Sequence, residues 1–344
     1  MTKRTERLSR RAALGWGATA TVGLALGPAT AAPAAPEAAR SAGGGAATRI
    51  AASYRRHSRR AGGTWYAYGS LAGAGQPVFN QRADEVIQAY SVNKVAVATA
   101  VLDKVDRGLL TLDQRIEVTS AIVIPGGDGI FSLDGAYPSS VTLGHALVAL
   151  LTVSDDTAVR LCGLVCPAAE LNEILAAKGF LYTRVEPVAN PNRFYLGTST
   201  PRETHDLLTR LVAGELLSAS STEFLLNALR SPIAFTDGIR RVASSRERSQ
   251  VATKAGWYDG ARHEAGVIFD VSGAPVLTYA LFGFLDTDAD DFGATHPLVA
   301  ARSVMGREFL DAVATVDVSS SVLARGGAAP VRWPAPEHRP TNGG

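Results

Sequence analysis

The chain has 344 residues, of which 46% are hydrophobic and 19% are charged, and its formal net charge is +2. This length and balance are ordinary for a globular protein with one large domain or two packed ones. No internal stretch has 18 consecutive apolar residues, and neither repeats nor nucleic-acid-binding motifs are evident, so we expect no transmembrane helix and no nucleic-acid partner.

The N-terminus has the pattern of an export signal. Residues 1–31 carry five Lys/Arg against one Glu, contain the twin-arginine pattern SRRAAL at 9–14, and end at the small residues 29–31. Without them the formal net charge falls from +2 to −2, so the basic character belongs to the signal. We expect the twin-arginine translocase of a bacterium to export the folded protein, which is then secreted or extracytoplasmic.

A low-complexity linker over 32–47, which we expect to be disordered, precedes a short helix, two strands, a run of helices, three strands and a last helix. A turn-rich segment over 124–140 interrupts them. The predicted strands are 64–72, 76–81, 250–256, 264–271 and 276–285. The predicted helices are 48–61, 91–107, 143–152, 155–164, 167–178, 201–213, 220–229 and 296–314.

This order predicts an α+β fold. The two early strands can join the three late ones in a single antiparallel sheet, and the central helices then form a second lobe. We expect one catalytic domain over 48–317, with an α/β lobe from 48–86 and 236–317 and a helical lobe over 87–235. A site between two such lobes lies in a cleft. The tail over 318–344 is rich in Pro, Gly and Ser and is expected to be disordered.

The two cysteines leave two interpretations open. Cys162 and Cys166 are four residues apart near the end of a predicted helix, so they could form a disulfide in an oxidising compartment or stay as buried thiols. Two cysteines alone make a poor metal site, and we expect neither a metal nor a cofactor.

A serine and a lysine share the start of an apolar helix. The stretch AYSVNKVAV over 89–97 places Ser91 and Lys94 one turn apart on the same face. A serine at this point is often only a helix cap. However, burial would lower the pKa of Lys94, and the helix N-terminus would favour an alkoxide, so the pair also has the character of an activated nucleophile.

Three further segments have an ordinary structural interpretation and a chemical one. Ser154-Asp155-Asp156 is a good helix cap. Glu186, in a loop bounded by prolines 187 and 191, is a typical surface carboxylate. Lys254 on a predicted strand is typical of a protected sheet edge.

Taken together and in this order, the segments resemble a known motif set. SVNK at 91–94, SDD at 154–156 and KAG at 254–256 resemble the S-x-x-K, S-D-N and K-T-G motifs of the penicillin-recognising serine enzymes. EPVAN at 186–190 resembles the E-x-x-x-N loop of the class A β-lactamases, and the resemblance runs from about 48 to 315. It implies the β-lactamase/transpeptidase-like fold and a serine hydrolase that opens β-lactam rings through an acyl-serine intermediate.

The resemblance also implies a role for each matching residue. Ser91 would be the acylated nucleophile, Lys94 would help to take its proton, and Ser154 would relay a proton to the leaving nitrogen. Glu186, with Asn190, would hold and activate the hydrolytic water. Whether Lys94 or Glu186 is the base for acylation stays open.

The third motif would bind the substrate. Lys254 would lower the local proton affinity and attract an anionic substrate, and Gly256 would lie beside it. The backbone N–H groups of Ser91 and Trp257 would form the oxyanion hole.

Two departures from the motifs affect substrate recognition. Asp156 replaces the usual Asn and Ala255 replaces the usual Thr or Ser, so an amide donor and a hydroxyl are missing. Arg262 or His263 on the next predicted strand could compensate with an anion contact. Phe131 could line the mouth of the cleft or belong to the core.

Other functions of the same fold remain as alternatives. They are a D-Ala-D-Ala peptidase, esterase or amidase, and a non-hydrolytic protein that only binds β-lactams. Glu186 favours hydrolysis, because an acyl-serine ester is long-lived unless a water is activated beside it. We therefore expect a monomeric enzyme with a small β-lactam or acyl-D-Ala-like substrate.

Overall fold

A five-stranded antiparallel sheet forms the centre of the computed structural model, which describes residues 37–133, 135–287, 289–318 and 329–337. The strand order is β2-β1-β10-β9-β8, so the two early strands join the three late ones as predicted. The strands are β1 (Thr64–Leu71), β2 (Phe79–Gln81), β8 (Val251–Tyr258), β9 (Ala261–Phe269) and β10 (Pro275–Phe284). The export signal predicted over 1–31 lies outside the described residues.

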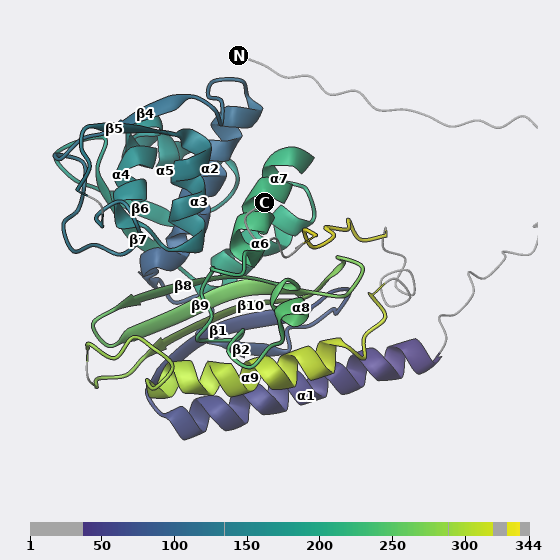
Figure 1. Cartoon of the computed structure of the whole chain (residues 1–344). Helices are drawn as coiled ribbons and strands as arrows, with labels where there is room; N and C mark the ends of the chain where they lie inside the picture. Colours follow the sequence, from purple (N-terminus) through teal and green to yellow (C-terminus); the bar gives the residue numbers. More distant parts are fainter. Residues whose placement is uncertain (1–36, 134, 288, 319–328, 338–344) are drawn as a thin grey trace, which may run out of the picture. The chain divides into compact units, whose positions relative to one another are not determined.

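Helices cover both faces of this sheet. All nine residues of β9 are buried, which a strand shows when both of its faces are packed. The helices α1 (Glu37–Ala61) and α9 (Pro297–Val313) lie side by side on one face (Figure 1). The other face carries the helical lobe, whose α6 contacts β1, β9 and β10.

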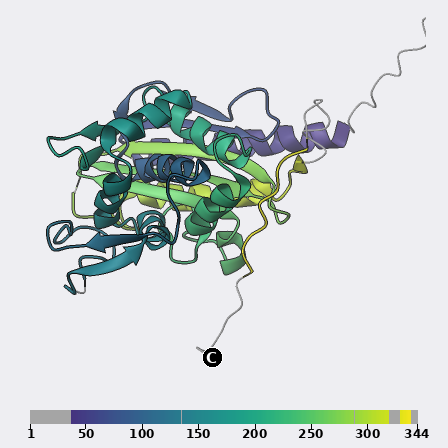
Figure 2. The same cartoon turned by 90° about the horizontal axis from the view of Figure 1, so that it is seen from above.

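The helical lobe is built around α2. Every residue from Lys94 to Leu102 is buried, and Figure 2 shows this dark-blue helix over the middle of the sheet. The helices of the lobe are α2 (Lys94–Asp106), α3 (Leu143–Thr152), α4 (Asp156–Val165), α5 (Ala168–Ala177), α6 (Pro201–Val212) and α7 (Ala219–Arg230). In the part of the chain that the structure describes, no helix is long and apolar enough to cross a bilayer.

The short elements differ from the sequence prediction. The structure adds two small sheets and one short helix, in segments of two to six residues that are too short to show a period. They are β3 (Ile87–Gln88), β4 (Arg115–Val118), β5 (Ser139–Thr142), β6 (Arg184–Pro187), β7 (Phe194–Ser199) and α8 (Ser245–Arg248).

The expected linker and tail are also partly ordered. Helix α1 begins at Glu37, not at 48. Its Ala46 is buried in the hydrophobic cluster that α1 and α9 form with the sheet. In the expected disordered tail, residues 329–337 are described and the indole of Trp333 is buried. Both predictions were therefore wrong for these residues, because composition alone does not show that an aromatic side chain finds a partner.

Candidate active site

The predicted nucleophile lies on a tight turn just before α2. Ser91 belongs to the 3-10 turn Tyr90–Asn93, and Lys94 is the first residue of the α-helix. Tyr90, directly before the serine, has a φ of 48°. This backbone conformation is strained for a residue other than glycine and persists only where the surrounding structure holds it. Ser91 is buried, with 8% of its surface exposed.

Strand β8 passes very close to this turn. A side-chain carbon on Gly256 would lie 2.9 Å from the backbone nitrogens of Ser91 and Val92, so only glycine allows the approach. Trp257 follows on the same strand, with its ring 5.9 Å from that of Phe235. The structure thus brings the first and third motifs together, whereas the oxyanion hole stays a prediction.

The hydroxyl of Ser154 lies between two buried amines. Lys94 Nζ is 3.1 Å from Ser154 Oγ and 2.5 Å from the Ser154 carbonyl oxygen, and Lys254 Nζ is 2.9 Å from the same Oγ. Lys94 is 0% exposed and Lys254 is 3% exposed. Ser154 itself has a φ of 57°, so its backbone is held in an unusual conformation where the three groups meet.

Burial makes both amines weaker bases than a surface lysine. It lowers the pKa of Lys94, against the opposing effect of nearby carboxylates. It lowers the pKa of Lys254 well below its usual range, and the neighbouring Lys94 adds to that shift. A lowered pKa raises the share of the neutral amine, which is the form that can accept a proton from a hydroxyl.

The two aspartates after Ser154 have different partners. Asp155 caps α4 by accepting from Ala158 N at 2.8 Å, and it also accepts from the backbone N–H of Ile130 and Phe131, at 2.6 and 2.9 Å. It therefore ties down the segment that carries the half-buried Phe131. Asp156 instead accepts from Lys94 Nζ at 2.8 Å, a contact that the sequence analysis missed.

The structure does not bring the predicted deacylation pair into this cluster. Glu186 is exposed on β6, opposite Tyr195 of β7, and not in a loop as expected. Among the described residues neither its carboxylate nor the Asn190 side chain hydrogen-bonds Ser91 or Lys94. Asn190 is exposed, and its Oδ1 accepts from the backbone N–H of Asn192 at 3.0 Å.

Arg262 and His263 do not supply the expected anion contact. Arg262 is 1% exposed and donates to backbone carbonyls, among them those of Ala289 and Asp291 at 2.9 Å. His263 is 3% exposed, with Nε2 3.1 Å from the Gln88 carbonyl oxygen. Burial lowers the pKa of His263 to about 4, so its ring is neutral. That prediction was wrong, because both side chains face inward and serve the backbone.

Cys162 and Cys166, which follow the second motif along the chain, are both buried free thiols. Burial raises the pKa of Cys166 to about 12, which makes it unreactive.

Ala255 of the third motif is also buried, and its carbonyl oxygen accepts from Lys254 Nζ at 2.7 Å. The described part of the chain has no group of three or more His, Cys, Asp or Glu residues that could hold a metal ion.

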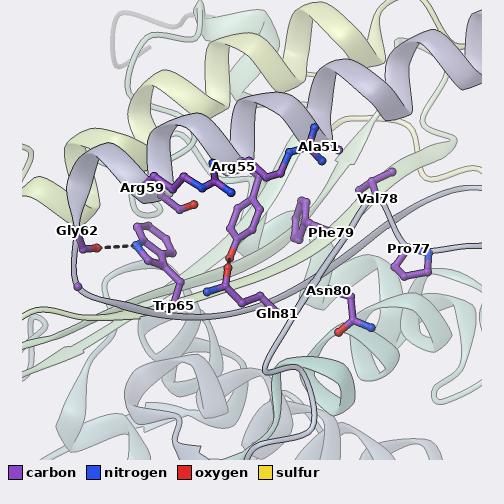
Figure 3. A pocket seen from close by; sticks show the side chains of 13 residues that line it. Ala51, Arg55, Arg59, Gly62, Trp65, Pro77, Val78, Phe79, Asn80 and Gln81 are labelled. Carbon is purple, nitrogen blue, oxygen red and sulfur yellow. Dashed lines mark hydrogen bonds between the residues drawn. The ribbon is translucent and has the colours of Figure 1, made fainter.

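A cavity lies at the edge of the sheet opposite β8, between α1 and the strands β1 and β2 (Figure 3). It has a volume of about 630 Å³ and is lined by Arg55, Arg59 and the stacked rings of Tyr54 and Phe79. It shares no lining residue with the serine–lysine cluster on β8, so it does not belong to the candidate active site.

Comparisons with known proteins agree with the motifs. The model of the β-lactamase enzyme family matches residues 47–297. A β-lactamase of Streptomyces fradiae is 31% identical over 80% of this chain and 90% of its own length, and one of Streptomyces cellulosae is 29% identical over 82% and 90%.

Solved structures show the same fold at lower identity. A β-lactamase from Xanthomonas campestris has a TM-score of 0.64 at 21% identity, covering 78% of this chain and 98% of its own. An ancestral class A β-lactamase has a TM-score of 0.64 at 23% identity, covering 76% and 99%. The chain therefore belongs to the β-lactamase enzyme family, the family that its three motifs predicted.

Proposed function

We propose that this chain is a serine hydrolase that opens β-lactam rings through an acyl intermediate on Ser91. The observation that carries the proposal is the Ser154 hydroxyl held between Lys94 and Lys254, at 3.1 and 2.9 Å, where Lys94 directly follows the turn that bears Ser91. Relatives named β-lactamases, up to 31% identical, support the substrate class.

Acylation follows from this arrangement. The Ser91 oxygen attacks the lactam carbonyl carbon and passes its proton to neutral Lys94. As the C–N bond breaks, Ser154 gives its proton to the ring nitrogen and regains one from Lys94. Lys254 keeps positive potential near an anionic substrate when protonated and, being 3% exposed, cannot drift away.

Deacylation completes the cycle. Water adds to the ester carbon, the C–O bond to Ser91 breaks, and the serine oxygen recovers a proton. The product is the ring-opened acid. The departure at Ala255 leaves these steps in place and removes a hydroxyl that would contact the substrate.

The test is incubation of the mature protein with a chromogenic cephalosporin, followed by intact mass measurement. Turnover without a lasting adduct supports the proposal. A lasting adduct without turnover identifies a β-lactam-binding protein instead, and cleavage of D-Ala-D-Ala peptides or esters alone identifies the peptidase or esterase alternative. Ser91→Ala is the matched control and should show neither turnover nor adduct.

We further propose that residues 1–31 direct export through the twin-arginine translocase and that the secreted enzyme is a monomer. The basic, twin-arginine character of the sequence supports the route. Replacing both Arg10 and Arg11 by Lys should leave the precursor inside the bacterium. Light scattering of the mature protein should give the mass of one chain; twice that mass would refute the monomer.

A further inference from the structure

Lys94 has a single carboxylate partner within ion-pair distance among the described residues. Its Nζ lies 2.8 Å from Oδ1 of Asp156, and its other two contacts are the carbonyl and hydroxyl oxygens of Ser154, at 2.5 and 3.1 Å. An ammonium group carries three protons, so these three acceptors use all of them. Asp156 thus helps to fix where Lys94 points.

Asp156 is also held in place from its other side. Its Oδ2 accepts from the backbone N–H of Asp128 at 3.1 Å, and the residue opens α4, where the helix dipole favours a negative charge. The side chain is 33% exposed and lines a cavity of about 400 Å³ together with Val159 and Arg160. The carboxylate therefore links a fully buried amine to solvent.

The neighbouring carboxylates do not form an ion pair with Lys94. Asp155 is 0% exposed, and its oxygens are taken by three backbone N–H groups. Glu186 is exposed on β6 and lines a different cavity, with Leu181 and Tyr182. The titratable groups that face Lys94 are Asp128, Asp155, Asp156, Lys254 and Cys162.

We propose that Asp156 is the carboxylate that positions Lys94 and sets its protonation, a role that the family resemblance does not give to it. The inference rests on the proposed function, since it needs Ser91 to react and Lys94 to take its proton. When that proton arrives, the ammonium forms 2.8 Å from an anion that stabilises it. Asp156 acts through Lys94 and is therefore a positioning residue. The Asn-to-Asp departure in the second motif becomes a gain of charge rather than the loss of a donor.

The test is the pH dependence of Ser91 labelling by a fluorophosphonate probe, followed by intact mass. Labelling rises with pH as Lys94 loses its proton, because the neutral amine is the base. In Asp156→Asn the Lys94 ammonium loses its counter-ion and its pKa falls. The rising part of the curve of labelling rate against pH, here called the limb, therefore moves to lower pH. At the pH where the parent labels at half its maximal rate, the variant should be near its own maximum. That maximum should be lower, because a weaker base takes the proton less readily.

Three further variants make the result specific. Asp103→Asn makes the same change in an aspartate–lysine pair between α2 and the end of α5, where Asp103 lies 2.7 Å from Lys178, and should leave the pH dependence of labelling unchanged. Asp156→Glu keeps the charge and should keep the limb closer to that of the parent than Asp156→Asn does. Glu186→Gln should shift the limb less than Asp156→Asn.

An unmoved limb in Asp156→Asn, or a larger shift in Glu186→Gln, overturns the inference. Circular dichroism confirms that each variant is folded. A parent protein that labels at Ser91 but turns over no β-lactam refutes the proposed substrate. The pH dependence of labelling then still tests the role of Asp156. A parent that does not label at Ser91 overturns both proposals.

Discussion

Two adjacent residues of β8 serve two buried polar clusters on opposite faces of the sheet. Lys254 donates to Ser154 Oγ on the side of the helical lobe, whereas Thr253 donates to Glu264 Oε1 at 2.9 Å on the other side. The alternation of side chains along a strand makes this division inevitable. We call them the serine cluster (Ser91, Lys94, Ser154, Asp156, Lys254) and the arginine cluster (Thr253, Glu264, Tyr279, Arg302).

The arginine cluster is closed. Glu264 and Arg302 are 0% and 1% exposed, with Arg302 Nε 3.2 Å from Glu264 Oε2. Glu264 also accepts from the backbone N–H of Ile239 at 3.2 Å, and Tyr279 donates to Thr253 Oγ1 at 3.1 Å. Its members contact one another and are buried, so the cluster holds α9 to the sheet and is out of reach of a substrate.

The serine cluster, by contrast, keeps one member in reach of solvent, since the Asp156 side chain is 33% exposed, and sets two amines against one carboxylate. Such an arrangement gives up some stability to keep reactive groups available. The comparison teaches that burial of charge alone does not identify an active site; a partly exposed carboxylate and an excess of buried amines do. Changes in the serine cluster should therefore affect chemistry, and changes in the arginine cluster should affect folding.

Lys94→Met should have the largest effect. Without the general base, probe labelling of Ser91 should fall by about 10²–10⁴-fold. The free energy of unfolding should change by less than about 1 kcal/mol, because an apolar side chain of similar volume replaces a buried ammonium and Asp156 stays hydrated. Labelling kinetics and urea denaturation measure the two effects. A large loss of stability with little loss of labelling would erase the distinction between the clusters.

Glu264→Ala should have the opposite signature. It leaves the Arg302 guanidinium buried without its anion, which costs about 3–5 kcal/mol of unfolding free energy. Urea denaturation measures the loss, and labelling of the fraction that remains folded should keep the pH dependence of the parent. A cost below about 1 kcal/mol would show that the arginine cluster is not what holds α9.

His263→Gln should weaken the dependence of stability on pH. The pKa of His263 is lowered from 6.5 to about 4 in the folded chain, so the unfolded chain binds more protons between these values. The parent should lose about 2–3 kcal/mol from this residue as the pH falls from 6.5 to 4.5, and the glutamine variant should not. Urea denaturation at pH 7.5 and at pH 4.5 gives the difference; equal differences in both proteins would refute the neutral, buried histidine.

Thr253→Val should give the smallest change. The isosteric replacement removes the donor to Glu264 and the acceptor for Tyr279, which should cost about 1–2 kcal/mol. Lys254, its neighbour on the opposite face, should be unaffected, so labelling of Ser91 should match the parent. A change in the labelling rate beyond the error of the assay would show that the two clusters communicate through β8.

Long periodic segments made most of the fold predictable. Helix α3 matches its predicted range, and the three late strands with their turns indicated the antiparallel sheet. The motifs also located Ser91, Lys94 and Lys254 in the chain. The meeting of the two lysines at Ser154 required the fold, because these contacts join residues 60 and 100 positions apart.

The position of Glu186 shows where motif spacing fails. Its four-residue separation from Asn190 is local, whereas its distance from Lys94 depends on how β6 pairs with β7. The pairing of Asp156 with Lys94, 62 positions away, was equally invisible. The sequence shows that Asp156 replaces the amide of the second motif. Only the packing of the helices shows that its carboxylate pairs with Lys94.

The buried indole of Trp333 has a consequence for motion between the two lobes. Trp333 donates from its backbone N–H to Gly273 O in the β9–β10 turn, and from Nε1 to Val212 O at the end of α6, both at 2.8 Å. Its carbonyl oxygen accepts from Arg230 of α7 at 2.7 Å. The C-terminal segment thus joins the β9–β10 turn to α6 and α7: hinging the lobes apart there would break these bonds and expose a large aromatic ring to water, so adaptation to substrates of different size falls to the loops around the serine.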